Sequence, residues 1–382
     1  MPKVLFVATV VKTHIMEFHI PYLKMFQEQG WETAVAARND YENPDECVIP
    51  YCDTYYDIPF ARNPLQPSNV TAYRKLKKII DEGEYDIIHC HTPVGGMLGR
   101  YAARHARRRG TRVIYTAHGF HFYKGAPLKN WLLYYPAERV MAHYTDVLIT
   151  INQEDYNRAQ GFHARQIYYV PGVGIDLKRF APQTDESVRT HENELKRAEL
   201  GLKQDDYVVL SVGELIKRKN HETVIRAIAE IKTNSNDVYQ HLQYVICGRG
   251  VLETQLKQLA KELEVQEHVH FLGYRSDICQ ICHASDLFVF MSLQEGLPVA
   301  LMEAMACGLP VVCSAIRGNV DLVVDGENGV LSENTTNDLA KNVSSFICGE
   351  IQLQDNLTMR LKKMQMFEIM FVKKQMKQIY FG

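Results

Sequence analysis

The chain has 382 residues, enough for two domains, and its 46% hydrophobic and 23% charged residues are typical of a globular protein. A formal net charge of −2 gives no overall reason to expect a nucleic-acid partner, and no apolar run approaches the roughly 20 residues of a membrane span. Nine cysteines without a paired framework indicate a reducing cytoplasm, and the first residues predict a strand, not a signal peptide.

The first half alternates strands and helices. A strand over 4–10, a helix over 17–29 and a strand over 33–37 form a βαβ opening, which predicts a parallel sheet. The turn Val10–His14 contains no glycine, so the dinucleotide fingerprint is missing and a nicotinamide dehydrogenase is not indicated. After a long connection over 38–67, further strands are expected at 86–91, 112–117, 147–151 and 167–170.

Three histidines lie on or after the strands of this half. His89 and His91 share one face of a strand, but no carboxylate or third histidine is spaced to complete a metal site, so a hydrogen-bonded pocket lining is favoured. His118 follows the next strand, and ligands gather at the carboxyl ends of strands in open parallel sheets. We therefore expect His118 to contact a substrate.

Glycines follow the strand that carries His91. The run Pro93–Gly99 opens a helix that we expect over 100–109. These glycines would allow an anionic group to approach the backbone, and close packing of the helix on a strand explains them equally well.

Charge is unevenly distributed between Asp86 and Glu138. No acidic residue lies between them, whereas eight basic residues do, and aromatic residues are interleaved with them. The basic residues are Arg100, Arg104, Arg107, Arg108, Arg109, Arg112, Lys124 and Lys129. This composition suits the headgroup layer of an anionic membrane, with contact through residues 87–137; a solvated basic helix over a buried aromatic cluster is the alternative.

The second half repeats the alternation. Strands are expected at 207–212, 242–247, 269–272, 287–290 and 309–313. The first strand is followed by Gly213 and then by Lys217, Arg218 and Lys219, and we expect Lys219 to bind a diphosphate as a point charge.

Two glutamates flank the start of a predicted helix over 300–306. Glu295 lies in the loop after a strand. Glu303 follows eight residues later, about two helical turns or about 12 Å further on. Between them, the backbone amides of Gly296, Leu297 and Val299 open the helix, an arrangement that favours an anion. Phosphates at the helix start and hydroxyl-rich rings at the carboxylates would fit a nucleotide diphosphate sugar.

One further pattern is Cys279-Gln-Ile-Cys282 with His283 beside it. A zinc site would need a second ligand pair, and none has suitable spacing, so we expect a helix with both thiols packed inward and no metal.

Taken together, these motifs resemble the retaining family-four glycosyltransferases of the GT-B fold, and the likeness covers nearly the whole chain. It is carried by Glu295–Glu303 with Ala304-x-Ala306-x-Gly308-x-Pro310, and by IIHCHTPVGG, YTAHGFHF, PGVGIDLKRF and VGELIKRKNH. Two departures stand out: Glu214 replaces an arginine that many members have, leaving Lys217 or Arg218 to supply that charge, and the first loop is not glycine-rich.

The resemblance implies an α/β protein with two Rossmann-like parallel-sheet domains facing a cleft. Residues 1–172 would form the acceptor and membrane-side domain, 173–365 the donor domain, and the last helix, from about residue 366, would return to the first domain. The resemblance also implies roles for site residues. Glu295 and His118 would contact the donor sugar, and Lys219 would neutralise the diphosphate. The backbone of Gly296, Leu297, Pro298 and Val299 would contact the sugar hydroxyls and the diphosphate. Glu303 would hold the ribose hydroxyls, the loop at Tyr274 and Arg275 would lie against the base, and Arg218 and Gly213 would lie nearby.

The implied activity is transfer of a hexosyl or N-acetylhexosaminyl group, with retention, from a nucleotide sugar that is UDP-linked. The acceptor would be a lipid-diphosphate-linked saccharide of exopolysaccharide or capsule synthesis at the inner membrane face, and neither a metal nor another cofactor would be needed. Two alternatives stay open: a sugar-nucleotide epimerase or hydrolase of the same fold, and a non-catalytic binder of nucleotide sugars.

Overall fold

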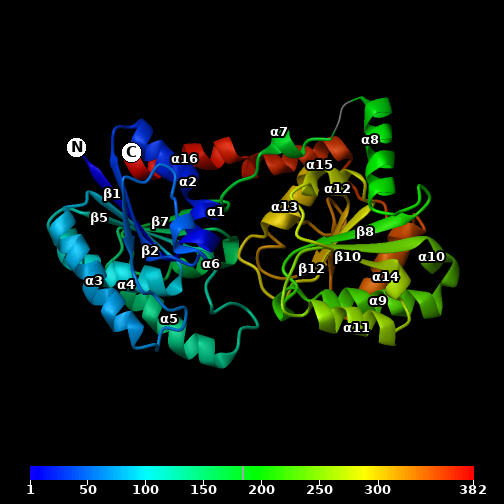
Figure 1. Cartoon of the computed structure of the whole chain (residues 1–382), viewed down its shortest axis with the longest axis horizontal. Helices are drawn as coiled ribbons and strands as arrows, with labels where there is room; N and C mark the ends of the chain where they lie inside the picture. Colours follow the sequence, from blue (N-terminus) through cyan, green and yellow to red (C-terminus); the bar gives the residue numbers. More distant parts are fainter. Residues whose placement is uncertain (183–184) are drawn as a thin grey trace. The chain divides into compact units, whose positions relative to one another are not determined.

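The computed structural model describes residues 1–182 and 185–382, and the chain divides into two compact units (Figure 1). The first unit contains Met1–Val173 and Gln375–Gly382, and the second contains Gly174–Lys374. Each unit has its own parallel sheet covered by helices, as the alternating pattern predicts. None of the described helices combines the length and apolar character that crossing a membrane requires.

The first unit is built on seven parallel strands in the order β3-β2-β1-β4-β5-β6-β7. The strands are β1 (Lys3–Val10), β2 (Glu32–Arg38), β3 (Thr54–Asp57), β4 (Ile87–His91), β5 (Arg112–Ala117), β6 (Val147–Thr150) and β7 (Gln166–Tyr169). All six expected strands are found, with bounds within one residue of the expected ones. The edge strand β3 lies inside the connection expected over 38–67, because its short, half-exposed residues lack the apolar run of a central strand.

Helices cover both faces of this sheet. In Figure 1, α3 and α4 lie on one face, and α2 and the end of α16 lie on the other. The helices of this unit are η1 (Val11–Ile15), α1 (Met16–Phe18), α2 (Ile20–Glu28), η2 (Pro44–Glu46), α3 (Ser68–Gly83), α4 (Pro93–Arg108), α5 (Leu128–Ala142), α6 (Gln153–Ala159) and most of α16 (Ile369–Phe381). The central strands are buried over almost their whole length, as parallel strands covered on both faces must be.

Helix α4 starts at Pro93, seven residues before the expected start. Proline suits the first turn of a helix because its missing N–H would have no intrahelical partner there. A Cβ at Gly96 would lie 2.4 Å from the Tyr115 ring, and one at Gly99 would lie 2.6 Å from the Cys90 sulfur. Close packing of the helix on the sheet therefore accounts for these glycines.

The second unit is built on six parallel strands in the order β10-β9-β8-β11-β12-β13. The strands are β8 (Tyr207–Val212), β9 (Leu242–Cys247), β10 (Val269–Gly273), β11 (Leu287–Phe290), β12 (Val311–Ser314) and β13 (Val330–Ser332). Three of them have the predicted bounds. The edge strand β13 has three residues and no pattern that distinguishes it from a turn.

Helices also surround the second sheet, with α9 and α11 on one side of it in Figure 1. The helices of this unit are α7 (Leu177–Phe180), α8 (Glu186–Glu199), η3 (Lys217–Lys219), α9 (His221–Asn234), α10 (Asn236–His241), α11 (Glu253–Glu262), η4 (Gln266–His268), α12 (Ile278–His283), α13 (Val299–Ala306), α14 (Thr336–Ile347), α15 (Leu357–Lys363) and η5 (Met364–Phe367). The core lies between the sheet and α9, α11 and α14, whose apolar faces are buried.

The last helix, α16, divides between the two units. Its start belongs to the second unit, where Glu368 forms a bridge with Ile175 and the Ile369 amide donates to the Ile175 carbonyl. Only from Gln375 does the helix belong to the first unit, where Tyr380 packs on Phe26 and bonds to His89. The boundary is later than the expected position near 366, because this backbone pairing ties the start of the helix to the second unit.

Candidate active site

Each sheet contains one point where the order of its strands reverses. In the first sheet this point lies between β1 and β4, and in the second it lies between β8 and β11. Loops that leave the carboxyl ends of the two neighbouring strands diverge there, and this is where ligands bind in open parallel sheets. At these points lie His14, in the helical turn after β1, and His91, the last residue of β4, in the first unit, and Lys219 and Glu295 in the second. The predicted residue His118 follows the next strand, β5.

In the second unit, two cations bind one carboxylate oxygen. The Lys219 Nζ lies 2.7 Å from Glu295 Oε1, and the Arg218 Nη1 lies 2.9 Å from the same oxygen. The Glu295 side chain is 8% exposed and the Lys219 side chain 13%, so the pair is largely shielded from water. The Lys219 ammonium also lies over the Phe290 ring, 4.8 Å from its centre. The structure thus brings together the two oppositely charged residues that sequence analysis chose from separate loops.

The backbone beside Glu295 is fixed by two contacts that the sequence did not suggest. Arg317 is buried and its Nε donates to the Glu295 carbonyl at 3.1 Å. Gly318 has a φ of +85°, and a Cβ there would lie 2.4 Å from the Gly296 carbonyl oxygen. Only glycine tolerates both that backbone conformation and that close approach. The segment after β12 therefore holds the loop after β11 in place.

Helix α13 starts directly after this loop. Its cap residue is Pro298 and its first residue is Val299, and no side chain caps the amino end. Gly296 and Leu297 precede the cap, and Leu297 is buried. The first amides of a helix have no intrahelical acceptor, so this end can bind an anion next to Lys219 and Arg218.

Glu303 lies on the same helix and is half-buried. Burial raises the pKa of its carboxyl group, and the nearby Arg179 partly offsets this shift. A half-buried carboxylate of this kind can accept hydrogen bonds from a pair of hydroxyl groups.

Two further predicted residues lie after β10. Tyr274 is 73% exposed, so its ring is free to stack on a flat ligand. Arg275 instead donates from Nε to Asp277 Oδ1 at 2.8 Å and from Nη2 to Glu199 Oε1 at 2.6 Å. The guanidinium group is thus committed to two carboxylates. After β8, Gly213 lies against the aliphatic part of Lys219, where a Cβ would lie 3.3 Å from Cδ.

Glu214 and its neighbours show which residue brings a positive charge to the site. The family resemblance leads us to expect arginine at this position, and the Glu214 carboxylate lies 3.7 Å from the Arg218 Nη2. Arg218 therefore brings a guanidinium group to the site from four residues further along, whereas Lys217 is exposed. Of the two substitutes considered from the sequence, Arg218 is the one that reaches Glu295.

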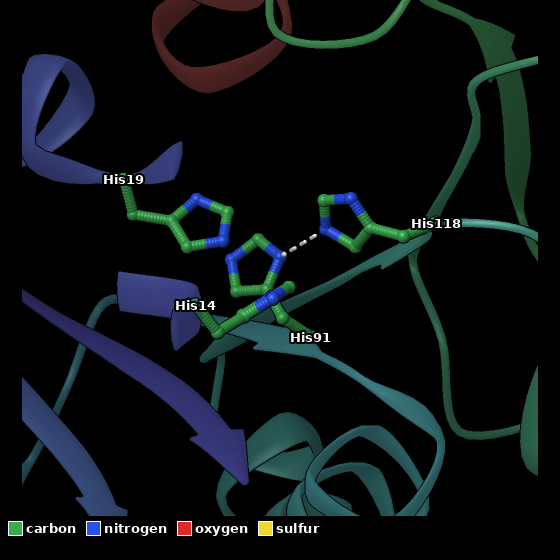
Figure 2. A group of neighbouring side chains, drawn as sticks. All are labelled: His14, His19, His91 and His118. Carbon is green, nitrogen blue, oxygen red and sulfur yellow. Dashed lines mark hydrogen bonds between the residues drawn. The ribbon is translucent and has the colours of Figure 1, made fainter. Parts of the chain in front are cut away.

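In the first unit, His118 lies in a group of histidine rings (Figure 2). His14 comes from η1, His19 from the turn between α1 and α2, His91 from β4 and His118 from the loop after β5. The His118 Nε2 lies 3.4 Å from the His91 Nδ1, and the His19 and His91 rings stack with centres 3.8 Å apart. The sequence placed only His89 and His91 together, since His14 and His19 precede them by about 70 residues.

Burial makes all of these rings neutral at neutral pH. It lowers the pKa of His118 to about 4 and lowers that of His91 well below its usual value, with smaller contributions from the neighbouring histidines. His14 and His19 shift in the same direction for the same first cause. A neutral His118 can donate or accept a hydrogen bond but cannot supply positive charge.

His89 behaves as the sequence analysis expected of a pocket lining. Its Nδ1 lies 2.8 Å from the Tyr380 hydroxyl and its Nε2 lies 2.8 Å from the Thr116 hydroxyl, so both ring nitrogens are bonded. Beside it, Thr92 has a φ of 63°, which is uncommon for a residue with a Cβ. The Thr9 amide donates to Thr92 Oγ1 at 3.1 Å, and the hydroxyl groups of the two threonines bond to each other at 2.7 Å, which holds this conformation.

Carboxylates neutralise part of the basic segment, which the sequence did not indicate. Arg100 is 1% exposed, and its Nη2 lies 2.8 Å from Glu138 Oε2, the acidic residue that ends the segment. Arg107 pairs with Asp146 at 2.9 Å. The expectation of eight uncompensated charges is therefore wrong, because the fold supplies carboxylates from outside the segment. The aromatic residues Phe120 and Phe122 are buried, as the alternative interpretation has it.

Helix α5, which begins in that segment and continues beyond it, has an exposed surface. The outward-facing residues are Leu128, Lys129, Leu132, Leu133, Arg139 and Val140, and Leu128 and Leu132 are more than 70% exposed. Apolar and basic side chains thus share one surface of this helix.

Two family models match the chain. "Glycosyl transferase 4-like" matches residues 3–152 and "Glycosyl transferases group 1" matches residues 192–364. The chain is 44% identical over 331 residues to the "Putative glycosyltransferase EpsD" of Bacillus subtilis (strain 168), covering 86% of this chain and 83% of that one. It is 34% identical over 291 residues to an Escherichia coli protein named UDP-Gal:alpha-D-GlcNAc-diphosphoundecaprenol alpha-1,3-galactosyltransferase, covering 75% of this chain and 70% of that one.

Solved structures share the fold. Anabaena HepE in complex with UDP and glucose matches with a TM-score of 0.77 at 20% identity, over 100% of this chain and 99% of that one. WaaG, a glycosyltransferase involved in lipopolysaccharide biosynthesis, matches with a TM-score of 0.71 at 17% identity, over 99% and 100%. At these identities the likeness shows the fold alone, and it confirms the expected GT-B architecture. The chain therefore belongs to the group 1, family-four glycosyltransferases of the GT-B fold, and it is a glycosyltransferase.

Proposed function

We propose that the protein transfers a sugar, with retention and without a metal ion, from a UDP-linked donor to a lipid-diphosphate-linked saccharide in the synthesis of a surface polysaccharide. The name of the Escherichia coli relative describes a UDP-linked donor and an undecaprenyl diphosphate-linked acceptor, and that relative is 34% identical to this chain. The observation that carries the proposal is the convergence of Lys219 and Arg218 on Glu295 beside the amino end of α13.

This arrangement fits a leaving nucleoside diphosphate. As the bond from the anomeric carbon to the phosphate oxygen breaks, negative charge grows on the diphosphate. The Lys219 ammonium, the Arg218 guanidinium and the free amides of α13 are fixed before the reaction and can stabilise that charge. Positive charge from these groups would take the place of a divalent cation. Glu295 holds both cations in position and would also contact the donor sugar.

Retention would follow from attack on the face that the diphosphate leaves. The acceptor hydroxyl forms the new bond to the anomeric carbon, and its proton passes to the departing phosphate oxygen. His118 would contribute a hydrogen bond to the sugar, since its pKa of about 4 keeps the imidazole neutral. Glu303 would accept hydrogen bonds from the ribose hydroxyls, and the loop with Tyr274 and Arg275 would lie against the base, with the exposed Tyr274 ring as the stacking surface.

The test is a transfer assay with purified protein in the presence of EDTA. A panel of UDP-sugars is offered with and without a polyprenyl diphosphate-linked saccharide, and the product linkage is assigned by NMR. We expect a product only with the acceptor, with the anomeric configuration of the donor. Rapid conversion of the donor alone would instead favour the epimerase or hydrolase. Binding of UDP-sugars without any turnover would favour the non-catalytic binder.

A matched pair of variants tests the role of Glu295. Glu295→Gln keeps the size of the side chain but removes the charge that holds Lys219 and Arg218, and we expect kcat to fall about 100-fold. Glu214→Gln removes the weaker, exposed partner of Arg218 and should change kcat by no more than about twofold. Equal effects of the two substitutions would contradict the assignment.

We propose that α5 brings the protein to the cytoplasmic face of the membrane, where such an acceptor is found. Leu128, Leu132 and Leu133 are exposed beside Lys129 and Arg139, and this mixture suits the boundary between headgroups and acyl chains. Each basic residue near an anionic surface contributes about 1 kcal/mol.

Sedimentation with vesicles tests this contact. The protein should bind vesicles that contain phosphatidylglycerol and should bind neutral vesicles weakly. The double variant Leu128→Ser, Leu132→Ser should lose most of this binding, whereas Val251→Ser, which changes an exposed apolar residue of the second unit, should keep it. Equal binding by both variants would exclude α5 as the contact.

A further inference from the structure

We propose that His14, His19, His91 and His118 form a binding site for one transition-metal dication of the Zn²⁺ class, coordinated by four imidazole nitrogens. The four rings converge from four separate segments of the first unit (Figure 2). One nitrogen from each ring lies within 4.8 Å of the corresponding nitrogen of every other.

The spacing is close to that of a tetrahedral site. In such a site, bonds of 2.0–2.1 Å place the ligand nitrogens about 3.3 Å apart. The His91 Nδ1 and His118 Nε2 lie 3.4 Å apart, which matches one edge of this tetrahedron. The remaining separations must shorten by rotation of His14 and His19. Both residues lie in the short turn and helix that follow β1, outside the rigid sheet.

Buried nitrogens without partners also indicate a missing ligand. Among the described residues, the His14 Nε2, the His91 Nε2 and both nitrogens of His19 have no hydrogen-bond partner. These three side chains are 8%, 1% and 2% exposed. A buried polar atom without a partner is costly, and protein structures rarely leave several in one place. An ion bound by His91 Nδ1 and His118 Nε2 would satisfy one unpartnered nitrogen each of His14 and His19, and His91 Nε2 would not be a ligand.

The group borders a cavity of suitable size. A cavity of about 20 Å³ is lined by His19, His91 and His118, among others, and this is enough room for one water-sized particle. A second cavity of about 210 Å³ is lined by His14 and His118. His118 lines both cavities.

The ligand set selects the class of ion. Four imidazoles and no carboxylate suit Zn²⁺, Cu²⁺ or Ni²⁺, whereas Mg²⁺ and Ca²⁺ prefer oxygen ligands. Imidazole must be neutral to coordinate, and burial lowers the pKa of all four histidines, so they are ready to bind at neutral pH.

Another group of metal-binding residues is less suitable. Ligand atoms of Cys279, His283 and Cys307 also lie within 4.8 Å of one another, and the spacing of Cys279 and Cys282 did not indicate Cys307. The hydrogen bond between the Cys279 and Cys307 thiols and their burial raise the pKa of Cys279. Its sulfur also donates to the Arg179 carbonyl at 3.2 Å. Only a thiolate binds metal well, so this group serves as a control.

Metal binding has a consequence for catalysis that rests on the proposed function. An ion that coordinates His118 withdraws the ring from the sugar, so Zn²⁺ should inhibit transfer although no metal is needed for it. A protein that binds Zn²⁺ at this group without losing transfer would overturn the role of His118 and leave the metal site intact.

The experiment uses untagged protein that has been stripped of metal with a chelator and returned to metal-free buffer. Calorimetric titration with Zn²⁺ should give one equivalent bound per chain, and Mg²⁺ should give none. Co²⁺ should give the strong visible absorption of a four-coordinate site, without the near-ultraviolet charge-transfer band of thiolate ligands. Absence of one-equivalent binding, or a thiolate band, would overturn the proposal.

Variants then locate the ion. His14→Ala and His19→Ala should each weaken Zn²⁺ binding by about 100-fold or more, because each removes one direct ligand. Cys279→Ala and His143→Ala should bind as the native protein does; the latter disrupts the exposed stacked pair of His143 and His163. Binding lost in Cys279→Ala but kept in His14→Ala would refute the site. If the buried variants fail to fold, the Co²⁺ spectrum of the native protein decides alone.

Discussion

The two points where the strand order reverses, one in each sheet, have the same topology and opposite chemistry. In the first unit, neutral histidines converge, and several of their nitrogens lack partners among the described residues. In the second unit, a lysine and an arginine share one carboxylate oxygen, so the charges are compensated at close range. The same strand arrangement thus presents either neutral nitrogen donors or fixed charges, because the residues after the strands decide the chemistry.

The largest expected difference is in stability at acid pH, which should destabilise the first unit more than the second. Five fully or nearly buried histidines of the first unit (His14, His19, His89, His91 and His118) have a lowered pKa, whereas His221 is the corresponding deeply buried residue of the second. Below the unfolded pKa of 6.5 the unfolded chain binds more protons, so stability is present above that pH and is lost as pH falls toward the folded values. Each histidine can lower the free energy of unfolding by up to about 1.4 kcal/mol per pH unit, and the five together by up to about 7 kcal/mol per pH unit.

Hydrogen exchange at pH 7.5 and pH 5.5 measures this difference region by region. Amides of β1, β4 and β5 should lose protection at the lower pH well before those of β8, β9 and β11. The comparison fails if both sheets lose protection together, or if the second loses it first.

The next largest effect should come from Lys219→Met in the second unit. The substitution keeps most of the aliphatic side chain over Phe290 but removes the charge next to Glu295. We expect kcat to fall about 100- to 1000-fold, the usual cost of removing one fixed group that stabilises developing charge. Steady-state transfer assays measure the loss. Lys217→Met, two residues earlier and exposed, is the control and should change kcat by no more than about twofold.

A smaller effect is expected from Glu303→Ala. A hydrogen bond to a charged group contributes about 1.5–3 kcal/mol, so the KM for the donor should rise about 10- to 100-fold while kcat changes little. This separates Glu303, which would bind the donor, from Lys219, which would act in the transition state. A large drop in kcat with an unchanged KM would place Glu303 in the chemical step instead.

The smallest effect should come from Tyr274→Ala. Stacking of an exposed aromatic ring on a base contributes about 1 kcal/mol, which corresponds to about a fivefold weaker binding of the nucleotide. Titration with UDP measures the change directly. Tyr274→Phe keeps the ring and should bind UDP as the native protein does. Equal weakening in both variants would implicate the hydroxyl group and not the ring.

Most of the secondary structure could be predicted from the sequence. Strands β5, β8, β9 and β11 have the predicted bounds, since buried parallel strands are short apolar runs between turn residues. The misses are edge strands such as β3 and the start of α4 at Pro93. In both cases contacts with distant segments determine the structure, and local composition does not carry that information.

The candidate sites show the same division. The sequence alone determined that Lys219 and Glu295 each follow a strand of a parallel sheet, because the alternation of strands and helices sends the carboxyl ends of all strands to one edge. That these two strands, β8 and β11, are neighbours was decided by the tertiary structure. Only the tertiary structure decided that Arg218 joins them, that Arg100 and Arg107 are neutralised, and that His14 and His19 meet His91 and His118. These contacts join residues that are tens of positions apart, and packing in three dimensions, not local spacing, brings them together.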